Sequence, residues 1–242
     1  MKKIIVENFK TLFYALIIAF IIRSLIFQPF YIPSSSMEPT LLVGDRLFVS
    51  KYSYGFSRHS LPFSPKIFSN RIFENKPEIG DIIVFKTPSD NRTDYIKRLI
   101  GKPGDKIQII NKDLYINNIK VIKKKIEIKN KIYCGNEIIE ANFYEEILPN
   151  GTKYIAVYKK EGTMLNTDEY FVPKGHYFFM GDNRDCSNDS RYLSDVGYVN
   201  FNNLVGKARI IFFSSDKKKG SIFKFWMWKD SLRTSRFFEK IK

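Results

Sequence analysis

Residues 34–42 read Ser-Ser-Ser-Met-Glu-Pro-Thr-Leu-Leu, and they place three hydroxyls directly after an apolar segment long enough to enter a membrane. A hydroxyl is a poor nucleophile until a base takes its proton. The two histidines, His59 and His176, lie in no local pattern that indicates a catalytic triad. The base must therefore be sought elsewhere, and Lys97 is the better candidate. Without such a base, a Ser-rich turn between two prolines is the simpler interpretation.

Lys97 lies in a run, residues 94–100, whose side chains alternate as in a β-strand. Tyr95 and Leu99 share its face, so its surroundings are apolar, whereas Arg98 points to the other face, where an ion pair suits it. Removal from water disfavours the ammonium form and lowers the pKa of a lysine, as a base working near neutral pH requires. The chain has 40 basic residues, so an ordinary exposed strand lysine is the alternative for this position taken alone.

The amino-terminal segment is apolar from residue 12 to 22 and continues through Leu25-Ile26-Phe27, behind lysines 2, 3 and 10. Counted from 11 to 27 it has 17 residues, or about 25 Å of helix, enough to cross a hydrocarbon core. A cleaved signal peptide would need small residues at a cut site, and residues 24–33 contain no Ala-x-Ala-like sequence. A buried amphipathic helix would need a polar face, which residues 12–22 lack. We therefore predict an uncleaved transmembrane anchor with a cytoplasmic amino terminus.

The net charge of +15 in 242 residues indicates an anionic partner, either nucleic acid or a membrane surface, although base composition of the genome can account for part of it. The basic tail contains Trp226 and Trp228 among Lys and Arg, which is typical of a segment at an anionic lipid surface. Nucleic-acid stacking would use the same residue types, but the outward topology favours lipid and excludes nucleic acid. Cys134 and Cys186 form no CxxC motif; we expect free thiols, with pairing in an oxidising compartment left open.

Four segments, residues 34–42, 80–85, 95–105 and 181–191, resemble the four sequence boxes of bacterial type I signal peptidases, in the family's order. The resemblance implies a membrane-anchored serine endopeptidase with a Ser/Lys dyad and no metal or organic cofactor. Its substrates would be signal peptides of exported preproteins, cleaved after small residues in an Ala-x-Ala-like pattern. Its location would be the bacterial inner membrane, crossed once, with the catalytic domain on the periplasmic or outer side and membrane lipids as a partner.

The resemblance also implies roles for individual residues. Ser36 would be the nucleophile, Lys97 the base, and Ser34 with the Ser36 N–H the oxyanion hole. Ser187 would orient the lysine, and Asp189 would pair with Arg191 and Arg98, with Asp182 nearby. The substrate groove would involve Phe30, Ile32, Pro33, Met37, Leu41, Leu47, Tyr95 and Ile96. Asp185, Ser187 and Asp189 alternate as in a calcium loop, but no glycine or distant glutamate completes that pattern.

The predicted fold is mainly β: an antiparallel sheet of the signal-peptidase type with a β-rich insertion, preceded by one transmembrane helix. Strands are indicated at residues 46–51, 81–85, 94–100, 106–110, 114–116 and 205–213. The predicted organisation is a cytoplasmic terminus (1–10), an anchor (11–28), a catalytic domain in two parts (29–104 and 175–215), the insertion (105–174) and the tail (216–242).

Two points stay open at this stage. The loop 53–78 carries Phe56, Phe63, Phe68 and Phe73, which either pack against the core or reach into the lipid interface. The alternative functions are a non-catalytic membrane-tethered β-domain that binds a partner outside the cytoplasm, and a basic nucleic-acid binder, which would require a cytoplasmic body.

Overall fold

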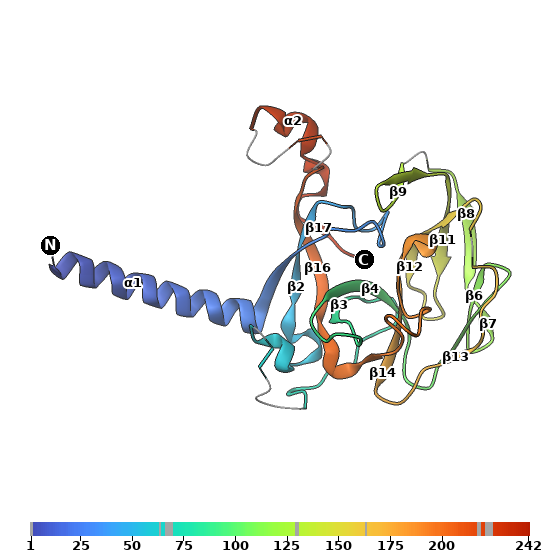
Figure 1. The fold of residues 1–242 in the computed structure, drawn as a ribbon, viewed down its shortest axis with the longest axis horizontal. Coiled ribbons are helices and arrows are strands. Elements are labelled where there is room, and N and C mark those ends of the chain that lie inside the picture. The colour runs from blue at the N-terminus through green and yellow to red at the C-terminus, as the bar shows by residue number, and fades with distance from the viewer. Residues whose placement is uncertain are drawn as a thin grey trace.

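The computed structural model describes residues 2–62, 64–65, 70–128, 131–162, 164–216, 219–220 and 225–242. Helix α1 (Lys2–Ile21) continues through a π-helical turn, η1 (Ile22–Ile26), and projects from the body as a single rod (Figure 1). The stretch Ile4–Ile26 is long and apolar enough to cross a membrane, and little of it is buried against the body. The predicted amino-terminal apolar helix is confirmed, and it starts before residue 11 because nothing between Lys2 and Leu12 breaks a helix; the bounds of the anchor, 11–28, stay a prediction.

The body is built on one antiparallel sheet in the order β1-β2-β16-β3-β4-β14-β15, with β17 paired to β16. Its strands are β1 (Phe27–Tyr31), β2 (Asp45–Ser50), β3 (Ile82–Lys86), β4 (Asp94–Gly101), β14 (His176–Met180), β15 (Val199–Asn200), β16 (Leu204–Ser214) and β17 (Glu239–Lys240). The mainly β fold and the antiparallel sheet are thus confirmed. Both faces of β3 are buried, as its unbroken apolar run predicts.

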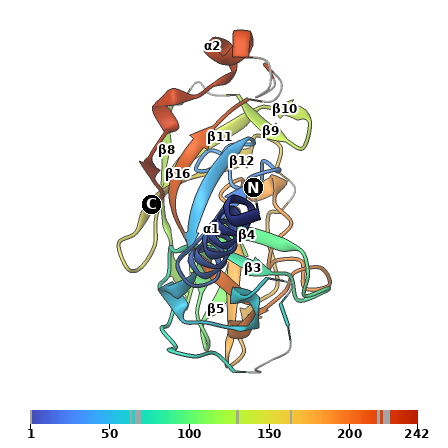
Figure 2. The ribbon, with the colours of Figure 1, turned by 90° about the vertical axis from the view of Figure 1, so that its left-hand side faces the viewer.

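The insertion adds small sheets beside the main one (Figures 1 and 2). Its strands are β5 (Lys106–Ile110), β6 (Asp113–Ile116), β7 (Ile119–Lys120), β8 (Ile122–Ile126), β9 (Ile132–Cys134), β10 (Glu137–Ile139), β11 (Ala141–Ile147), β12 (Lys153–Lys159) and β13 (Tyr170–Phe171). Asn117 and Asn118 turn the chain between β6 and β7 with φ of 52° and 64°, conformations that asparagine tolerates and that a tight hairpin turn needs.

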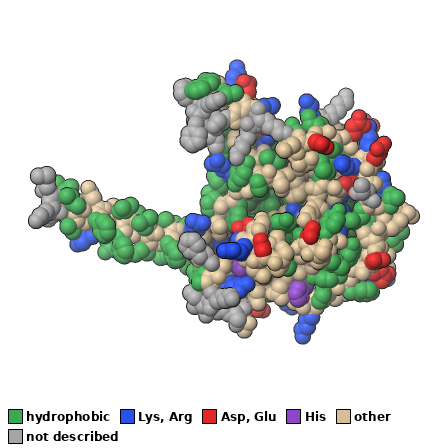
Figure 3. Space-filling view, viewed as in Figure 1, with side chains coloured by type: hydrophobic (Ala, Val, Ile, Leu, Met, Phe, Trp, Pro, Cys, Tyr) green, Lys and Arg blue, Asp and Glu red, His purple; other side chains and the backbone are tan. Residues whose placement is uncertain are grey.

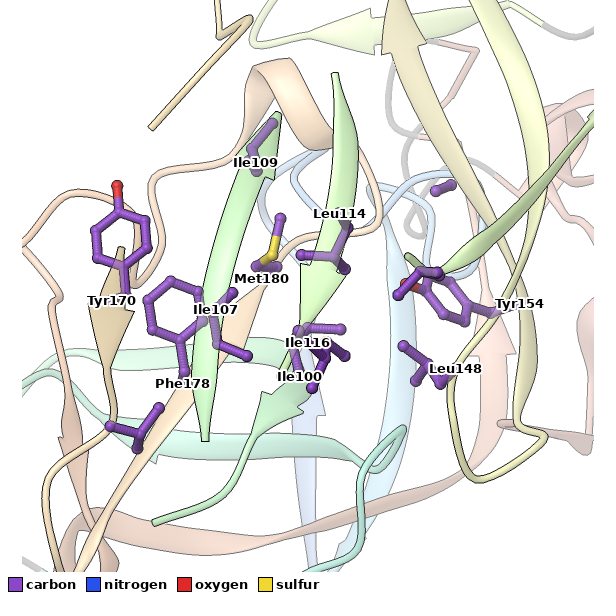
Figure 4. Packing of buried hydrophobic residues seen from close by; sticks show 13 residues of the cluster. Ile100, Ile107, Ile109, Leu114, Ile116, Leu148, Tyr154, Tyr170, Phe178 and Met180 are labelled. Carbon is purple, nitrogen blue, oxygen red and sulfur yellow. The ribbon is translucent and has the colours of Figure 1, made fainter. Parts of the chain in front are cut away.

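A hydrophobic cluster joins the insertion to the main sheet. Ile107 and Ile116 from the insertion pack with Ile100 of β4 and with Phe178 and Met180 of β14 (Figure 4). These side chains are at most 2% exposed. The insertion therefore shares its core with the strands that carry the candidate active site, and it cannot be treated as an independent appendage.

Short helical turns connect the strands: η2 (Lys51–Tyr54), η3 (Arg58–Ser60), η4 (Arg184–Cys186), η5 (Phe201–Asn203), η6 (Phe225–Met227), α2 (Trp228–Ser231) and η7 (Thr234–Arg236). The end of the tail packs on the body, because Arg236 forms an ion pair with Asp45 at 2.7 Å and β17 extends the sheet. Trp226 and Trp228 are 66% and 44% exposed. Binding of the tail to lipid stays a prediction.

The aromatic loop after β2 is described in part. Phe63 and Phe68 lie outside the described residues, and Phe56 pairs through its backbone with Ile72. Phe73 is 82% exposed, so packing of the loop against the core does not account for it.

Candidate active site

The serine loop, residues 34–42, is held in place by the core and by the edge of β2. The backbone of Ile32 exchanges hydrogen bonds of 2.9 Å with Asp45 and Gly44 where the loop leaves β1. Met37 and Leu41, which follow the serines, are fully buried. These two apolar side chains thus anchor the loop in the core, and of the three serines only Ser34 is exposed.

Ser36 and Lys97 meet across this loop although 61 residues separate them. The Lys97 amine lies 2.7 Å from the Ser36 hydroxyl, at the distance of a direct hydrogen bond, and also donates to the Ile96 carbonyl at 3.2 Å. Lys97 is 4% exposed, and its amine nitrogen lies 5.3 Å from the centre of the Tyr95 ring. The amine is therefore enclosed, as expected for a lysine on the apolar face of this strand.

Burial lowers the pKa of Lys97 to about 8, from a usual value of 10.5. The carboxylates of Asp189 and Asp182 oppose this shift, and the Arg191 guanidinium adds to it. Removal from water outweighs the two carboxylates because each of these is bound to an arginine. An appreciable fraction of the amine is consequently neutral near pH 7.5, as a general base must be.

A groove of about 550 Å³ opens beside the dyad, within the usual range for a binding site. Ser34 lies in its wall, with its hydroxyl 3.3 Å from that of Ser36. Of the eight residues predicted for substrate binding, those lining the groove are Phe30, Ile32, Pro33, Tyr95 and Ile96. Met37, Leu41 and Leu47 do not line it, because they are fully buried in the core underneath.

The acidic-basic loop, residues 181–191, forms two buried ion pairs beside Lys97. Arg98 binds Asp182 through two hydrogen bonds of 2.8 and 2.7 Å, and Arg191 binds Asp189 at 2.8 Å. The expected pairing of Arg98 with Asp189 is therefore wrong. Asp182 takes that place because it lies two residues beyond the end of β14, whose last residue, Met180, lies opposite Arg98 in the register. Burial raises the pKa of Asp189, but Arg191 overcomes this and lowers it overall.

Ser187 is buried close to the dyad without touching the amine. Among the described residues its hydroxyl makes no hydrogen bond of good geometry, but it lies near enough to the Asp189 carboxylate to contribute to the lowered pKa of that group. A side chain on Gly181 would collide with this hydroxyl and with the Ser36 carbonyl, so these three residues pack tightly together. The Asn183 N–H also donates to the Ser36 carbonyl, at 3.1 Å. An orienting role for Ser187 requires a small movement of the hydroxyl or the amine, and it stays a prediction.

Cys134 and Cys186 form a disulfide, so the expectation of free thiols is wrong. The bond joins the β9–β10 hairpin to the loop that carries Ser187, and Gly135, Asn136 and Cys186 form one wall of the groove. The hairpin also binds the serine loop, since the Gly135 N–H donates to the Ser35 hydroxyl at 3.2 Å. The cysteines lie 52 residues apart, and no local pattern indicates that the chain brings them together.

A second contribution of the insertion also escapes sequence reasoning. Glu146 of β11 is 1% exposed and binds Arg184 of the acidic-basic loop, at 3.1 and 2.7 Å. Tyr154 and Tyr158 each donate to this carboxylate at 2.6 Å. Glu145 and Glu146 adjoin within one strand, and only the pairing of β11 with β12 decides which of them points inward. The insertion therefore stabilises the site without contributing to its chemistry.

We expect Glu146→Ala to lower the free energy of unfolding by about 3–5 kcal/mol, because it leaves the Arg184 guanidinium buried without its counter-ion. Urea unfolding of the purified chain in detergent measures this. Glu140→Ala is the matched control, since its partner Lys160 and its own carboxylate are both well exposed, and it should change stability far less. Equal losses from the two variants would contradict the assignment.

The comparisons with known proteins agree on one family. The family model described as "Signal peptidase, peptidase S26" matches residues 5–213. Signal peptidase I from Rickettsia typhi is 41% identical over 99% of this chain and 95% of its own length. Signal peptidase I from Rickettsia bellii is 42% identical over 99% of this chain and 87% of its own length. A solved signal peptidase I from Enterococcus faecalis is 29% identical and covers 55% of this chain and 97% of its own, with a TM-score of 0.32, too low to support an argument. With a family model matched over most of its length and such relatives, the chain belongs to the signal peptidase family, peptidase S26.

Proposed function

We propose that Ser36 and Lys97 form the catalytic dyad of this signal peptidase. The observation that carries the proposal is the 2.7 Å contact between the hydroxyl and a buried amine whose pKa is lowered to about 8. A charged amine donates in this contact, whereas the neutral amine accepts the hydroxyl proton. The same pair of atoms is thus arranged for proton transfer once the lysine has lost its charge.

The reaction follows from this geometry. The neutral Lys97 amine takes the Ser36 proton as the oxygen attacks the scissile carbonyl, and the ammonium so formed gives the proton to the leaving amine. The Ser34 hydroxyl and the Ser36 N–H stabilise the oxyanion, and each such donor contributes about 2.7–4 kcal/mol. Water, activated by the same amine, then hydrolyses the acyl-enzyme. Asp182, Arg98, Asp189 and Arg191 hold the surrounding strands, and Ser187 orients the amine.

The substrate segment binds as an added strand. β14 pairs with β4 only along Arg98–Gly101, so residues 94–97 keep one free edge among the described strands, directly at the groove. An extended peptide gains main-chain hydrogen bonds at such an edge. Phe30, Ile32 and Ile96 give the groove apolar walls, and we expect these to admit small side chains before the cut.

Membership of the family establishes the general function, without assigning individual residues. The chain is a signal-peptide-cleaving serine peptidase anchored by its amino-terminal apolar helix, and preprotein signal peptides are its substrates. This assignment leaves the non-catalytic β-domain as the disfavoured alternative. That alternative would require function to survive without the hydroxyl and the amine.

We expect Ser36→Ala and Lys97→Ala each to abolish cleavage of a purified preprotein in detergent, by at least about 10³-fold in kcat/KM, because each removes a whole step of the chemistry. Gel separation of precursor and mature product measures this. Lys124→Ala, at an exposed lysine of β8, is the control and should retain full activity. Undiminished processing by Lys97→Ala would leave the dyad without support.

The pH profile tests the lysine itself. The protonated amine is inactive, so kcat/KM should fall about tenfold per pH unit below the pKa of Lys97, which is about 8, and should level off above it. Initial rates between pH 6 and 9.5 measure this limb, and unfolding curves at the same pH values show whether the fold is intact. A profile that is flat in this range, or that still rises tenfold per pH unit at pH 9.5, would contradict a lowered lysine pKa.

We further propose that the anchor crosses the bacterial inner membrane once, with the body on the outer side. The lysines at the amino terminus support a cytoplasmic start, and the Cys134–Cys186 bond supports an oxidising compartment for the body. Protease added to spheroplasts should therefore degrade the body, and denatured protein from cells should bind thiol reagents only after reduction. Full protection of the body before lysis would overturn this orientation.

A further inference from the structure

A second cavity, of about 670 Å³, lies outside the catalytic groove and shares no lining residue with it. Arg58, Lys86 and Arg92 supply cationic side chains to its wall, beside His59 and Asn91. None of these residues has a role in the proposed peptidase reaction. Figure 3 shows Lys and Arg side chains gathered where the rod of α1 joins the body.

The cavity is positive although Asp90 also lines it. The Asp90 carboxylate is occupied by its own loop, accepting from the Thr87 and Thr93 hydroxyls and from the Arg92 N–H. The Lys86 amine also forms an ion pair with the Asp94 carboxylate at 2.8 Å. Burial and the nearby cations, Arg58 first among them, lower the pKa of His59 to about 4, so its ring is neutral at physiological pH. An anion entering the cavity meets guanidinium groups and few competing carboxylates.

The wall of this cavity is tied to the chain just after the candidate membrane span. The span ends at Ile26, and Gln28 follows two residues later. The Lys51 amine donates to the Gln28 side chain at 2.9 Å and to the His59 carbonyl at 2.8 Å. Lys51 thus holds the turn of Arg58 and His59 next to the end of the span, and a span that crosses a bilayer would bring this turn near the lipid headgroups. Figure 1 shows this turn region directly beside the end of α1.

The same region also exposes apolar side chains, and binding of a soluble anion would not require them. Tyr52 and Phe73 are 50% and 82% exposed. The Tyr52 ring lies 5.9 Å from that of Phe27, the first residue after the anchor. Ile72, which is 46% exposed, pairs with Phe56, two residues before Arg58. Cations beside exposed aromatic and aliphatic side chains are typical of a surface that sits in a lipid interface.

We infer that this cavity binds the phosphate of an anionic phospholipid from the leaflet next to the body. Arg58 and Arg92 hold the phosphate oxygens, Lys86 adds its charge, and the acyl chains lie along α1 and the apolar side chains around Phe73. A free phosphate would use the cations alone. The assignment rests on the membrane anchor and not on the Ser36–Lys97 dyad.

Native mass spectrometry of the full chain in detergent tests this site with added phosphatidylglycerol and, for comparison, phosphatidylcholine of the same acyl chains. The wild type should bind phosphatidylglycerol several-fold more tightly. The double variant Arg58→Gln/Arg92→Gln should lose roughly 20- to 30-fold in that affinity, since each cation near an anionic lipid contributes about a factor of five. Arg92→Gln alone, a change at an exposed side chain, should lose about fivefold and serves if the double variant does not fold.

Lys124→Gln/Lys125→Gln removes the same charge from exposed lysines of β8 and should leave lipid affinity unchanged. Preprotein cleavage in detergent should be the same in every variant, which separates this site from the peptidase assignment. The inference is overturned if the β8 control loses as much affinity, if phosphatidylcholine binds the wild type equally well, or if millimolar inorganic phosphate displaces the lipid completely.

Discussion

The structure depends on keeping one amine out of water without giving it a counter-ion. A buried lysine next to a free carboxylate would hold its proton and be useless as a base. Asp182 and Asp189 are close enough to raise the pKa of Lys97, yet burial prevails. The reason is that Arg98 and Arg191 occupy these two carboxylates. Paired in this way, the two carboxylates compensate Lys97 only in part for its loss of hydration, and its pKa stays lowered.

Such an arrangement requires further hydrogen bonds, because a buried ion pair recovers its desolvation energy only when its remaining polar atoms are satisfied. Thr40 donates to Asp182, the Gly181 N–H donates to Asp189, and the Gly80 carbonyl accepts from Arg98. In the insertion, Glu146 pairs with the buried Arg184 in the same way, and two tyrosines donate to the Glu146 carboxylate. The loop 181–191 is therefore ordered by ion pairs with β4 and β11 and by a third ion pair within the loop itself.

Sequence reasoning succeeded where local pattern decides the structure. Alternation along residues 94–100 is enough to enclose Lys97, and an apolar run is enough to form α1. Sequence reasoning failed where a contact depends on which distant segments of the chain come together. The resemblance implies Asp189 as a partner of Arg98, and the local pattern could not correct this, because alternation fixes the face of a side chain but not its partner 84 residues away. The Cys134–Cys186 pair and the burial of Met37, Leu41 and Leu47 depend in the same way on how the strands assemble.

The junction between anchor and body has a mechanical consequence. Helix α1 passes through η1 straight into β1, with no irregular residue between Lys2 and Tyr31, and β1 is locked into the sheet by β2. A body joined by a flexible tether would sample many heights and tilts above the bilayer. Here α1, η1 and β1 follow one another without an irregular residue, so the separation between the end of the apolar span and Ser36 is set by β1 and the serine loop. For the proposed nucleophile this means that a chain held in the same membrane is reached only at the height above the bilayer that the fold prescribes.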